Sequence, residues 1–276
     1  MDSLKRRVGI VGFGRLGEFL YKEVVESQNL QVAFVWNRSL DKVKGIVPDD
    51  LILVNLDDFA TRSPDLIVEV SHPSIVAEYG LRFLHTADFM IGSPTALADR
   101  DVSTALFEEA KRSHGLYVAV GALWGAQDIQ KMADGGTLKG LKVTMKKHPS
   151  AFKLCGYLVE KLQKVGSDPF TLYEGCVKDL CPLAPNNVNT MACAAIAAHN
   201  LGFDGVVGCL VADPSLTTHV IEIEVAGPGN ATEQFIVRTV RTNPALSGVV
   251  TGKLTYASFL SSLLGAHGRG CGVHLC

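Results

Sequence analysis

The stretch VGIVGFGRLG, residues 8–17, decides the fold, because a strand-like run leads through G-x-G-x-x-G into a helical pattern. Gly12 permits a tight turn, Gly14 lets a pyrophosphate approach the backbone, and Gly17 lets the helix pack closely on the strand. Free N–H groups at the start of the helix then face the phosphates. The alternative is a glycine-rich turn without a ligand. We predict that dinucleotide is bound by Gly12, Phe13, Gly14, Arg15, Leu16 and Gly17.

Strand and helix patterns alternate over the first 120 residues. After the opening strand, further strand-like runs lie at 32–36, 66–70, 89–91 and 116–120. Helical spacing follows the glycine turn, and acidic and basic ends mark a helix over 99–112. Such alternation is typical of βαβ units, so we expect a parallel sheet.

The pattern changes after about residue 123, where strand-like runs dominate. They are LKVTMKK, TLYEGCV, VVGCLVAD, HVIEIEV and EQFIVRTV, with an alanine-rich helix over about 188–199. These runs favour a mostly antiparallel sheet. We expect a loop over 239–252, a helix over about 253–264 and a loosely ordered glycine-rich tail. The expected domains are 1–122, completed by 250–276, and 123–249.

Composition narrows the classes of protein. Hydrophobic residues make up 47% of the 276 residues, and the net charge of −2 argues against binding to nucleic acid or an anionic membrane. Seven cysteines without a C-x-x-C pair form neither a zinc pattern nor a disulfide framework, and we expect no metal site. We expect no signal peptide at the N-terminus, and no run of 18 apolar residues occurs. We expect a cytoplasmic protein.

The choice of dinucleotide depends on the residues after the second strand. The fingerprint expects an acid about 20 residues after its last glycine, where it would bind the ribose 2′-hydroxyl, but Asn37 stands there. Arg38 follows and can pair with a 2′-phosphate, with Ser39 as a neutral donor. An exposed arginine without a ligand is the alternative. We predict binding of NADP or NAD, with NADP slightly favoured.

Other loops leave the expected carboxyl ends of strands, where open α/β sheets bind ligands. His72 and Pro73 follow one strand, and we assign them to the cofactor, with simple turn chemistry as the alternative. Glycines in GALWG, residues 121–125, would let the backbone pass close to a nicotinamide ring or merely turn the chain. The start of the alanine-rich helix holds more asparagines than its N-terminal cap needs, at positions 186, 187 and 189, so one is free to bind a ligand.

His219 stands at the mouth of a strand in VADPSLTTHVIEIEVAG, residues 211–227. From Val220 onward apolar and acidic residues alternate, which indicates a half-buried strand. The histidine is either an ordinary loop residue or a proton carrier, since its reference pKa of about 6.5 suits acid–base work at neutral pH.

Taken together, the motifs resemble those of the L-aspartate dehydrogenase family, and animal members most closely. The resemblance covers nearly the whole chain and rests on VGIVGFGRLG, PDLIVEVSHP, IGSPTALAD, GALWGAQDI, CPLAPNNVNTMA and VADPSLTTH. It implies a Rossmann domain followed by an α+β domain that helps to form a homodimer. It also implies oxidation of L-aspartate by NAD or NADP to iminosuccinate, which hydrolyses to oxaloacetate and ammonia. By the same resemblance His219 is catalytic, Asn189 binds cofactor and Ala122 contacts the nicotinamide end.

The chain departs from the family pattern near the expected site. The turn between Pro214 and His219 is about two residues shorter than in microbial members, the usual asparagine just before the histidine is missing, and Trp124 replaces a small residue. The shortened turn keeps a second reading open. The alternative is a catalytically silent dinucleotide-binding sensor of metabolites or redox state. A dicarboxylate substrate also needs cations, and the candidates are Lys146, Lys147, Arg238 and Arg241.

Overall fold

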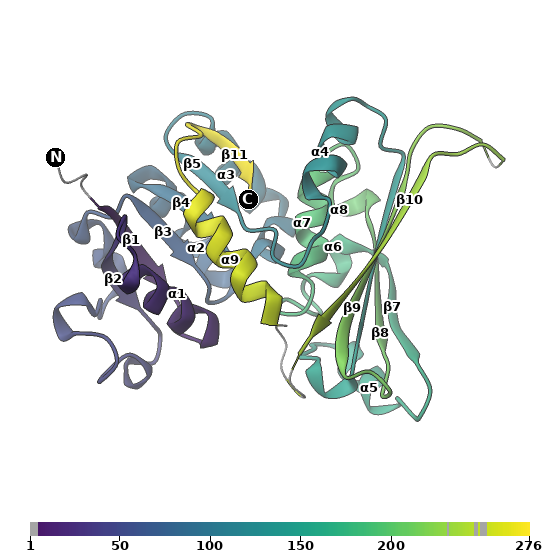
Figure 1. Cartoon of the computed structure of the whole chain (residues 1–276), viewed down its shortest axis with the longest axis horizontal. Coiled ribbons are helices and arrows are strands. Elements are labelled where there is room, and N and C mark those ends of the chain that lie inside the picture. The colour runs from purple at the N-terminus through teal and green to yellow at the C-terminus, as the bar shows by residue number, and fades with distance from the viewer. Residues whose placement is uncertain (1–4, 231, 246–247, 249–252) are drawn as a thin grey trace.

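The computed structural model describes residues 5–230, 232–245, 248 and 253–276, and it has two halves, each built on one sheet (Figure 1). The first sheet runs in the order β11-β5-β4-β3-β1-β2 with every pair parallel, as expected. Its strands are β1 (Arg6–Val11), β2 (Leu30–Trp36), β3 (Leu66–Glu69), β4 (Asp88–Ile91), β5 (Gly115–Val118) and β11 (Gly272–Leu275). The strand order reverses between β1 and β3, which is where open α/β sheets bind ligands.

Helices cover both faces of the first sheet. α1 (Arg15–Glu26) and α9 (Lys253–Gly265) lie on one face, and α2 (Pro73–Thr86) and α3 (Arg100–Ala110) lie on the other (Figure 1). Leu20 and Val24 of α1 share an apolar cluster with Phe259 and Leu263 of α9. The late helix is therefore part of the first half, although the whole second sheet precedes it in the chain.

The C-terminal tail is ordered, which corrects the expectation of a loose tail. β11 pairs with β5 in parallel, from Gly272 opposite Gly115 to Leu275 opposite Val118. The pairing satisfies backbone groups on the edge of β5 that would otherwise need water. Val120 N also donates to Cys276 O (2.8 Å), so the pairing extends toward the segment after β5.

The second sheet runs in the order β10-β9-β6-β8-β7 and is mostly antiparallel, as expected, with β6 and β8 as its parallel pair. Its strands are β6 (Gly140–Lys147), β7 (Phe170–Cys176), β8 (Val207–Ala212), β9 (Thr218–Ala226) and β10 (Ile236–Pro244). β10 continues to Pro244, so the expectation of a loop from residue 239 is wrong over its first residues. Cross-strand pairing with β9 keeps these residues extended.

The helices of the second half are short. They are α4 (Ala126–Asp134), α5 (Tyr157–Gln163), α6 (Val177–Leu180), α7 (Asn189–Ala197) and α8 (Gly202–Gly205). α7 is buried nearly all round, which its small alanine side chains allow. One apolar cluster runs from α2 and α3 through α7 to the inner face of the second sheet. We infer two closely packed domains with a boundary near residue 122; the second expected boundary, at residue 250, lies outside the described residues.

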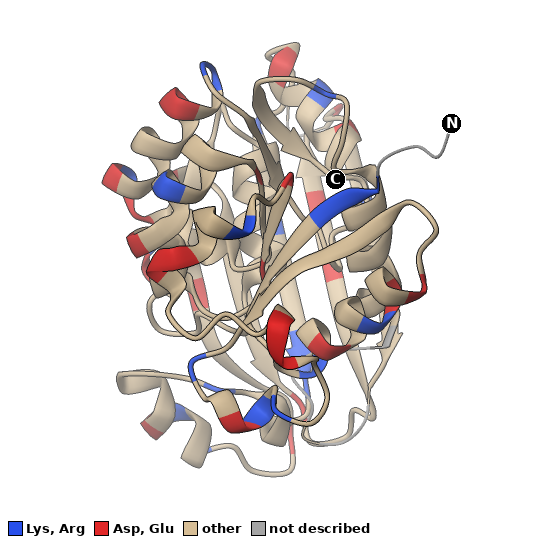
Figure 2. Ribbon diagram, turned by 90° about the vertical axis from the view of Figure 1, so that its left-hand side faces the viewer, with Lys and Arg blue, Asp and Glu red and all other residues tan. Residues whose placement is uncertain are grey.

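The surface carries both signs of charge. Lysine and arginine are interspersed with aspartate and glutamate over the view in Figure 2. Among the described helices, none has the length and apolar character needed to cross a membrane.

Candidate active site

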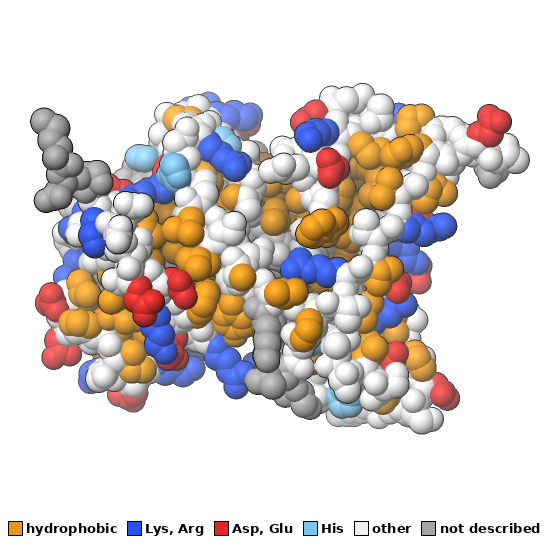
Figure 3. Space-filling model, viewed as in Figure 1, with side chains coloured by type: hydrophobic (Ala, Val, Ile, Leu, Met, Phe, Trp, Pro, Cys, Tyr) orange, Lys and Arg blue, Asp and Glu red, His pale blue; other side chains and the backbone are white. Residues whose placement is uncertain are grey.

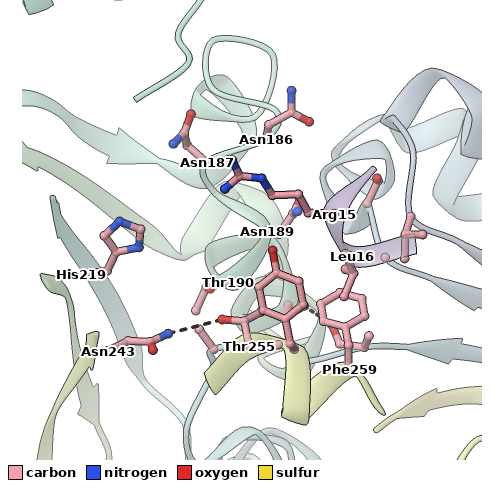
Figure 4. A pocket seen from close by; sticks show the side chains of 18 of the residues that line it. Arg15, Leu16, Asn186, Asn187, Asn189, Thr190, His219, Asn243, Thr255 and Phe259 are labelled. Atoms are coloured by element: carbon pink, nitrogen blue, oxygen red, sulfur yellow. Dashed lines mark hydrogen bonds between the residues drawn. The ribbon is translucent and has the colours of Figure 1, made fainter. Parts of the chain in front are cut away.

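A cavity of about 530 Å³ lies at the junction of the two halves. Its wall contains the start of α1, the segments after β3, β4 and β5, and residues of α7, β6, β9, β10 and α9. In Figure 4, Arg15 and His219 come from different halves of the molecule and project into the same space. Apolar side chains line parts of the furrow between the halves in Figure 3. The cavity therefore joins the expected cofactor site to the expected catalytic histidine.

The glycine turn is shaped for a phosphate group. Gly12 has φ +109°, a left-handed conformation that disfavours other residues, and a Cβ there would lie 2.7 Å from Ser71 Cβ. A Cβ on Gly17 would overlap the carbonyl oxygen of Gly12, whereas a Cβ on Gly14 would meet open space. α1 begins after Gly14 without a side-chain cap, so its first N–H groups are available to an anion. The residues present therefore fit a pyrophosphate.

Asn37 supports this turn. Its Oδ1 accepts a hydrogen bond from Phe13 N (2.9 Å), and its Nδ2 donates to Ser39 O (2.9 Å). Arg38 and Ser39 are exposed after β2, on the side where the fingerprint places the adenosine ribose. The structure thus brings Asn37 to the glycine loop and leaves Arg38 open to solvent, outside the cavity wall.

His72 caps α2. Its Nδ1 accepts a hydrogen bond from Ser74 N (3.2 Å), and Pro73 occupies the first helical position. The His72 side chain is exposed and does not line the cavity. The structure therefore accounts for these residues as a helix start, and their contact with a cofactor stays a prediction.

Glu69 is a buried carboxylate next to the cavity that our sequence analysis missed. Its side chain is fully buried at the end of β3. Oε1 accepts from Ser71 N (2.7 Å), Ser71 Oγ (3.0 Å), His72 N (2.9 Å) and Ser93 Oγ (3.0 Å), and Oε2 accepts from Ser93 N (3.0 Å). Burial raises the pKa of this carboxyl, and the hydrogen bonds oppose that shift. Glu69 thereby ties together the loops after β3 and β4, both of which reach the cavity.

The asparagines at the start of α7 divide into two roles. Asn187 is structural, since its Oδ1 accepts from Lys153 N (2.8 Å) and its Nδ2 donates to Ala151 O (3.1 Å). Asn189 lines the cavity, and its buried Oδ1 accepts no hydrogen bond from the described residues. A buried acceptor without a partner is uncommon in a folded protein, and a bound donor would satisfy it. Ala122 lines the cavity as well.

His219 is buried, with 6% of its surface exposed, and lies on the wall of the cavity. Asn243 of β10 stands opposite it in the sheet register. The Asn243 side chain is held by Thr255, whose Oγ1 accepts from Nδ2 (3.3 Å), and by Leu254, whose N donates to Oδ1 (3.3 Å), as Figure 4 shows for Thr255. Sequence analysis missed Asn243 and Thr255. Their bond links the sheet beside His219 to α9 of the first half.

The four candidate cations for a dicarboxylate lie in different places. Lys146 and Arg238 point away from the cavity and form ion pairs with glutamates on the outer face of β9. Arg241 is partly buried but does not line the cavity. Lys147 lines it and is 3% exposed.

Two family models match the chain. Residues 12–119 match the NAD-binding domain of homoserine dehydrogenase, and residues 128–263 match the C-terminal domain of aspartate dehydrogenase. Together the matches cover most of the chain, including the whole second sheet, while β1 and β11 of the first sheet lie outside them. The prediction from residues 8–17, a domain with the fold that binds a nicotinamide dinucleotide, is thereby confirmed.

Individual relatives agree with these matches. An aspartate dehydrogenase domain-containing protein of Xenopus tropicalis is 52% identical over 282 residues, which span 100% of this chain and 99% of the relative. An L-aspartate dehydrogenase of Methanococcoides burtonii is 28% identical, over 93% of this chain and 95% of its own. The crystal structure of aspartate dehydrogenase from Thermotoga maritima has the same fold, with a TM-score of 0.69, 21% identity and coverage of 96% and 97%. This chain belongs to the aspartate dehydrogenase family.

Proposed function

We propose that the protein is an NAD(P)-dependent L-aspartate dehydrogenase. It oxidises the CH–NH₂ group of L-aspartate to iminosuccinate, which water converts to oxaloacetate and ammonia. The observation that carries the proposal is the burial of His219 in the same cavity as the glycine turn. The named activity of the relatives in Methanococcoides burtonii and Acinetobacter baumannii supports it.

The proposed site has one end that binds the cofactor and another end where the substrate reacts. The turn from Gly12 to Gly17 holds the pyrophosphate, and Ala122 and Asn189 hold the nicotinamide end. The bound dinucleotide supplies the acceptor for the hydride that leaves Cα. His219 takes the proton that the substrate nitrogen must lose, so its imidazole acts as the general base. The buried position of His219 keeps water away from this transfer.

The activity is tested with purified protein, either dinucleotide and L-aspartate. Turnover should raise the near-ultraviolet absorbance of the reduced nicotinamide, and the other amino acids serve as controls. A protein that binds the dinucleotide yet oxidises no amino acid would instead be a dinucleotide-binding sensor.

We further propose that NADP binds at least as well as NAD. No carboxylate stands at position 37 to repel a 2′-phosphate, and exposed Arg38 can offer it a planar pair of donors. A charged hydrogen bond of this kind contributes about 1.5–3 kcal/mol, less where solvent and salt screen it. Arg38→Ala should therefore weaken NADP binding by up to about tenfold and leave NAD binding unchanged.

Titration of both dinucleotides into wild type and Arg38→Ala measures this difference. Lys44→Ala removes another exposed cation from the same half and is the matched control. Tenfold tighter binding of NAD than of NADP by wild type would show that Arg38 points away from the ribose.

We also propose a homodimer formed through the outer face of the second sheet. In Figure 1 the helices α4, α6, α7 and α8 lie on one side of this sheet, and no helix of the described part of the chain covers its other side. That side carries Val240, which is 68% exposed, beside the ion pairs of β9. Uncovered faces and edges of sheets favour pairing with a second chain.

We also propose that the protein is cytosolic. All seven of its cysteines are free, which suits a reducing compartment.

Light scattering should give about twice the chain mass of 29.6 kDa. Val240→Asp places a charge on the proposed interface and should yield a monomer. Val54→Asp changes an equally exposed valine (69%) of the first half and should leave the dimer intact. A wild-type monomer at micromolar concentration would contradict the proposal.

A further inference from the structure

The register of the second sheet delivers three polar side chains to one end of one face. Asn243 of β10 stands opposite His219 of β9. On the other side of β9, Lys146 of β6 is paired with Val220, so one further step along the antiparallel register brings Lys147 across from His219. Neighbouring strands lie about 5 Å apart. Lys147, His219 and Asn243 therefore form a row across three strands.

This row faces the cavity rather than solvent. Alternation along β6 places Leu141, Val143 and Met145 on the buried face, and Lys147 continues that set. Lys147, His219 and Asn243 are 3%, 6% and 2% exposed, and all three line the cavity. Lysine side chains are rarely buried this deeply. The fold thus brings a cation to the cavity wall beside His219.

The charge of the cavity wall indicates the kind of ligand. Among the described residues that line it, Arg15, Lys147 and Lys153 are cationic and none is an aspartate or glutamate. Arg15 belongs to the glycine turn and lies near the expected phosphates, whereas Lys147 lies beside His219 at the other end. Burial lowers the pKa of Lys147 to about 8, so the ammonium form predominates at neutral pH. An anionic group beside His219 would be attracted to it.

We propose that Lys147 binds a carboxylate of the substrate next to His219. The assignment rests on the proposed function, since it takes the reacting molecule to be an amino acid. Lys147 approaches the carboxylate from the sheet while His219 acts on the nitrogen of the substrate. The Lys147 Nζ atom lies 6.0 Å from the centroid of the Phe152 ring. Because folding already holds the ammonium in place, little side-chain entropy is lost when the carboxylate binds.

Binding of succinate to the protein saturated with oxidised dinucleotide tests this subsite without requiring turnover. Succinate offers two carboxylates and no amine. Lys147→Met should weaken its binding by about 10- to 100-fold, the loss expected for one charge-assisted hydrogen bond. Lys146→Met removes the neighbouring lysine, which faces outward, and should bind succinate like wild type.

Dinucleotide affinity and thermal midpoint of Lys147→Met show whether the variant is folded, and both should match wild type. Three results would overturn the subsite: unchanged succinate binding by this variant, loss of its dinucleotide binding, or failure of wild type to bind succinate. The aspartate assay separates the two proposals. If Lys147→Met oxidises L-aspartate with the KM of wild type, the subsite alone is refuted. If succinate binding depends on Lys147 but wild type does not oxidise L-aspartate, the dehydrogenase alone is refuted.

Discussion

His219→Ala is expected to lower kcat by about 10²- to 10⁴-fold, the range found when a general base is removed. The dissociation constant of the dinucleotide should stay within about twofold, because His219 lies on β9 and the phosphates are expected at α1. Steady-state kinetics with L-aspartate and titration with the dinucleotide measure the two quantities. This split between rate and binding is what distinguishes a proton carrier from a residue that merely holds the fold.

The control is His148→Ala. His148 follows β6 in the same half, but it is partly exposed and does not line the cavity, and its Nδ1 bonds to Ser150 Oγ (2.8 Å) as part of a short helix start. Its loss should leave kcat unchanged. Added imidazole should restore part of the rate to His219→Ala. Near wild-type turnover of His219→Ala would end the catalytic assignment.

Replacement of two glycines in the turn is expected to separate stability from dinucleotide binding. Gly17→Ala places a methyl group against the carbonyl of Gly12, so α1 must shift from β1. We expect a loss of about 3 kcal/mol in the free energy of unfolding, at the upper end for overpacking. For a chain of this size, the loss lowers Tm by roughly 6–12 °C.

Gly14→Ala is the opposite case. A Cβ on Gly14 meets nothing within 4 Å, and its φ of −82° suits any residue, so the fold and Tm should be preserved. The same methyl group occupies the space that the pyrophosphate needs, and the dinucleotide should bind about 10- to 100-fold more weakly. Calorimetry and titration of both variants test the pair. Normal dinucleotide affinity in Gly14→Ala would place the phosphates elsewhere.

Local patterns predicted much of this molecule because their causes are local. The spacing of Gly12, Gly14 and Gly17 specifies a turn and a helix start on its own, and the alternation after His219 specifies β9. The same alternation in β6 already places Lys147 on the face of Val143 and Met145, so the sequence held the means to choose it among the four cations. Glu69, a single acid inside the apolar run of β3, was a comparable signal that we overlooked.

Other features depend on pairs that are remote in the chain. Asn243 lies in a stretch that resembles a loop, and its place beside His219 follows only from the pairing of β10 with β9. Its bond to Thr255 joins two elements whose proximity no local pattern encodes. β11 is four residues long and rich in neither β-branched nor aromatic side chains, so only the open edge of β5 makes it a strand.

The pairing of β11 with β5 also bears on the order in which the protein folds during synthesis. Gly115 leaves the ribosome long before Gly272, so β5 lacks its partner strand β11 while all of the second sheet is synthesised. Contacts between such distant residues form late, since closing the long intervening loop is entropically unfavourable. The first half can therefore reach its final form only after the second has been synthesised. Nascent chains arrested before α9 should expose the apolar surface that α1 later shares with Phe259, and they are the stage at which chaperones are most needed.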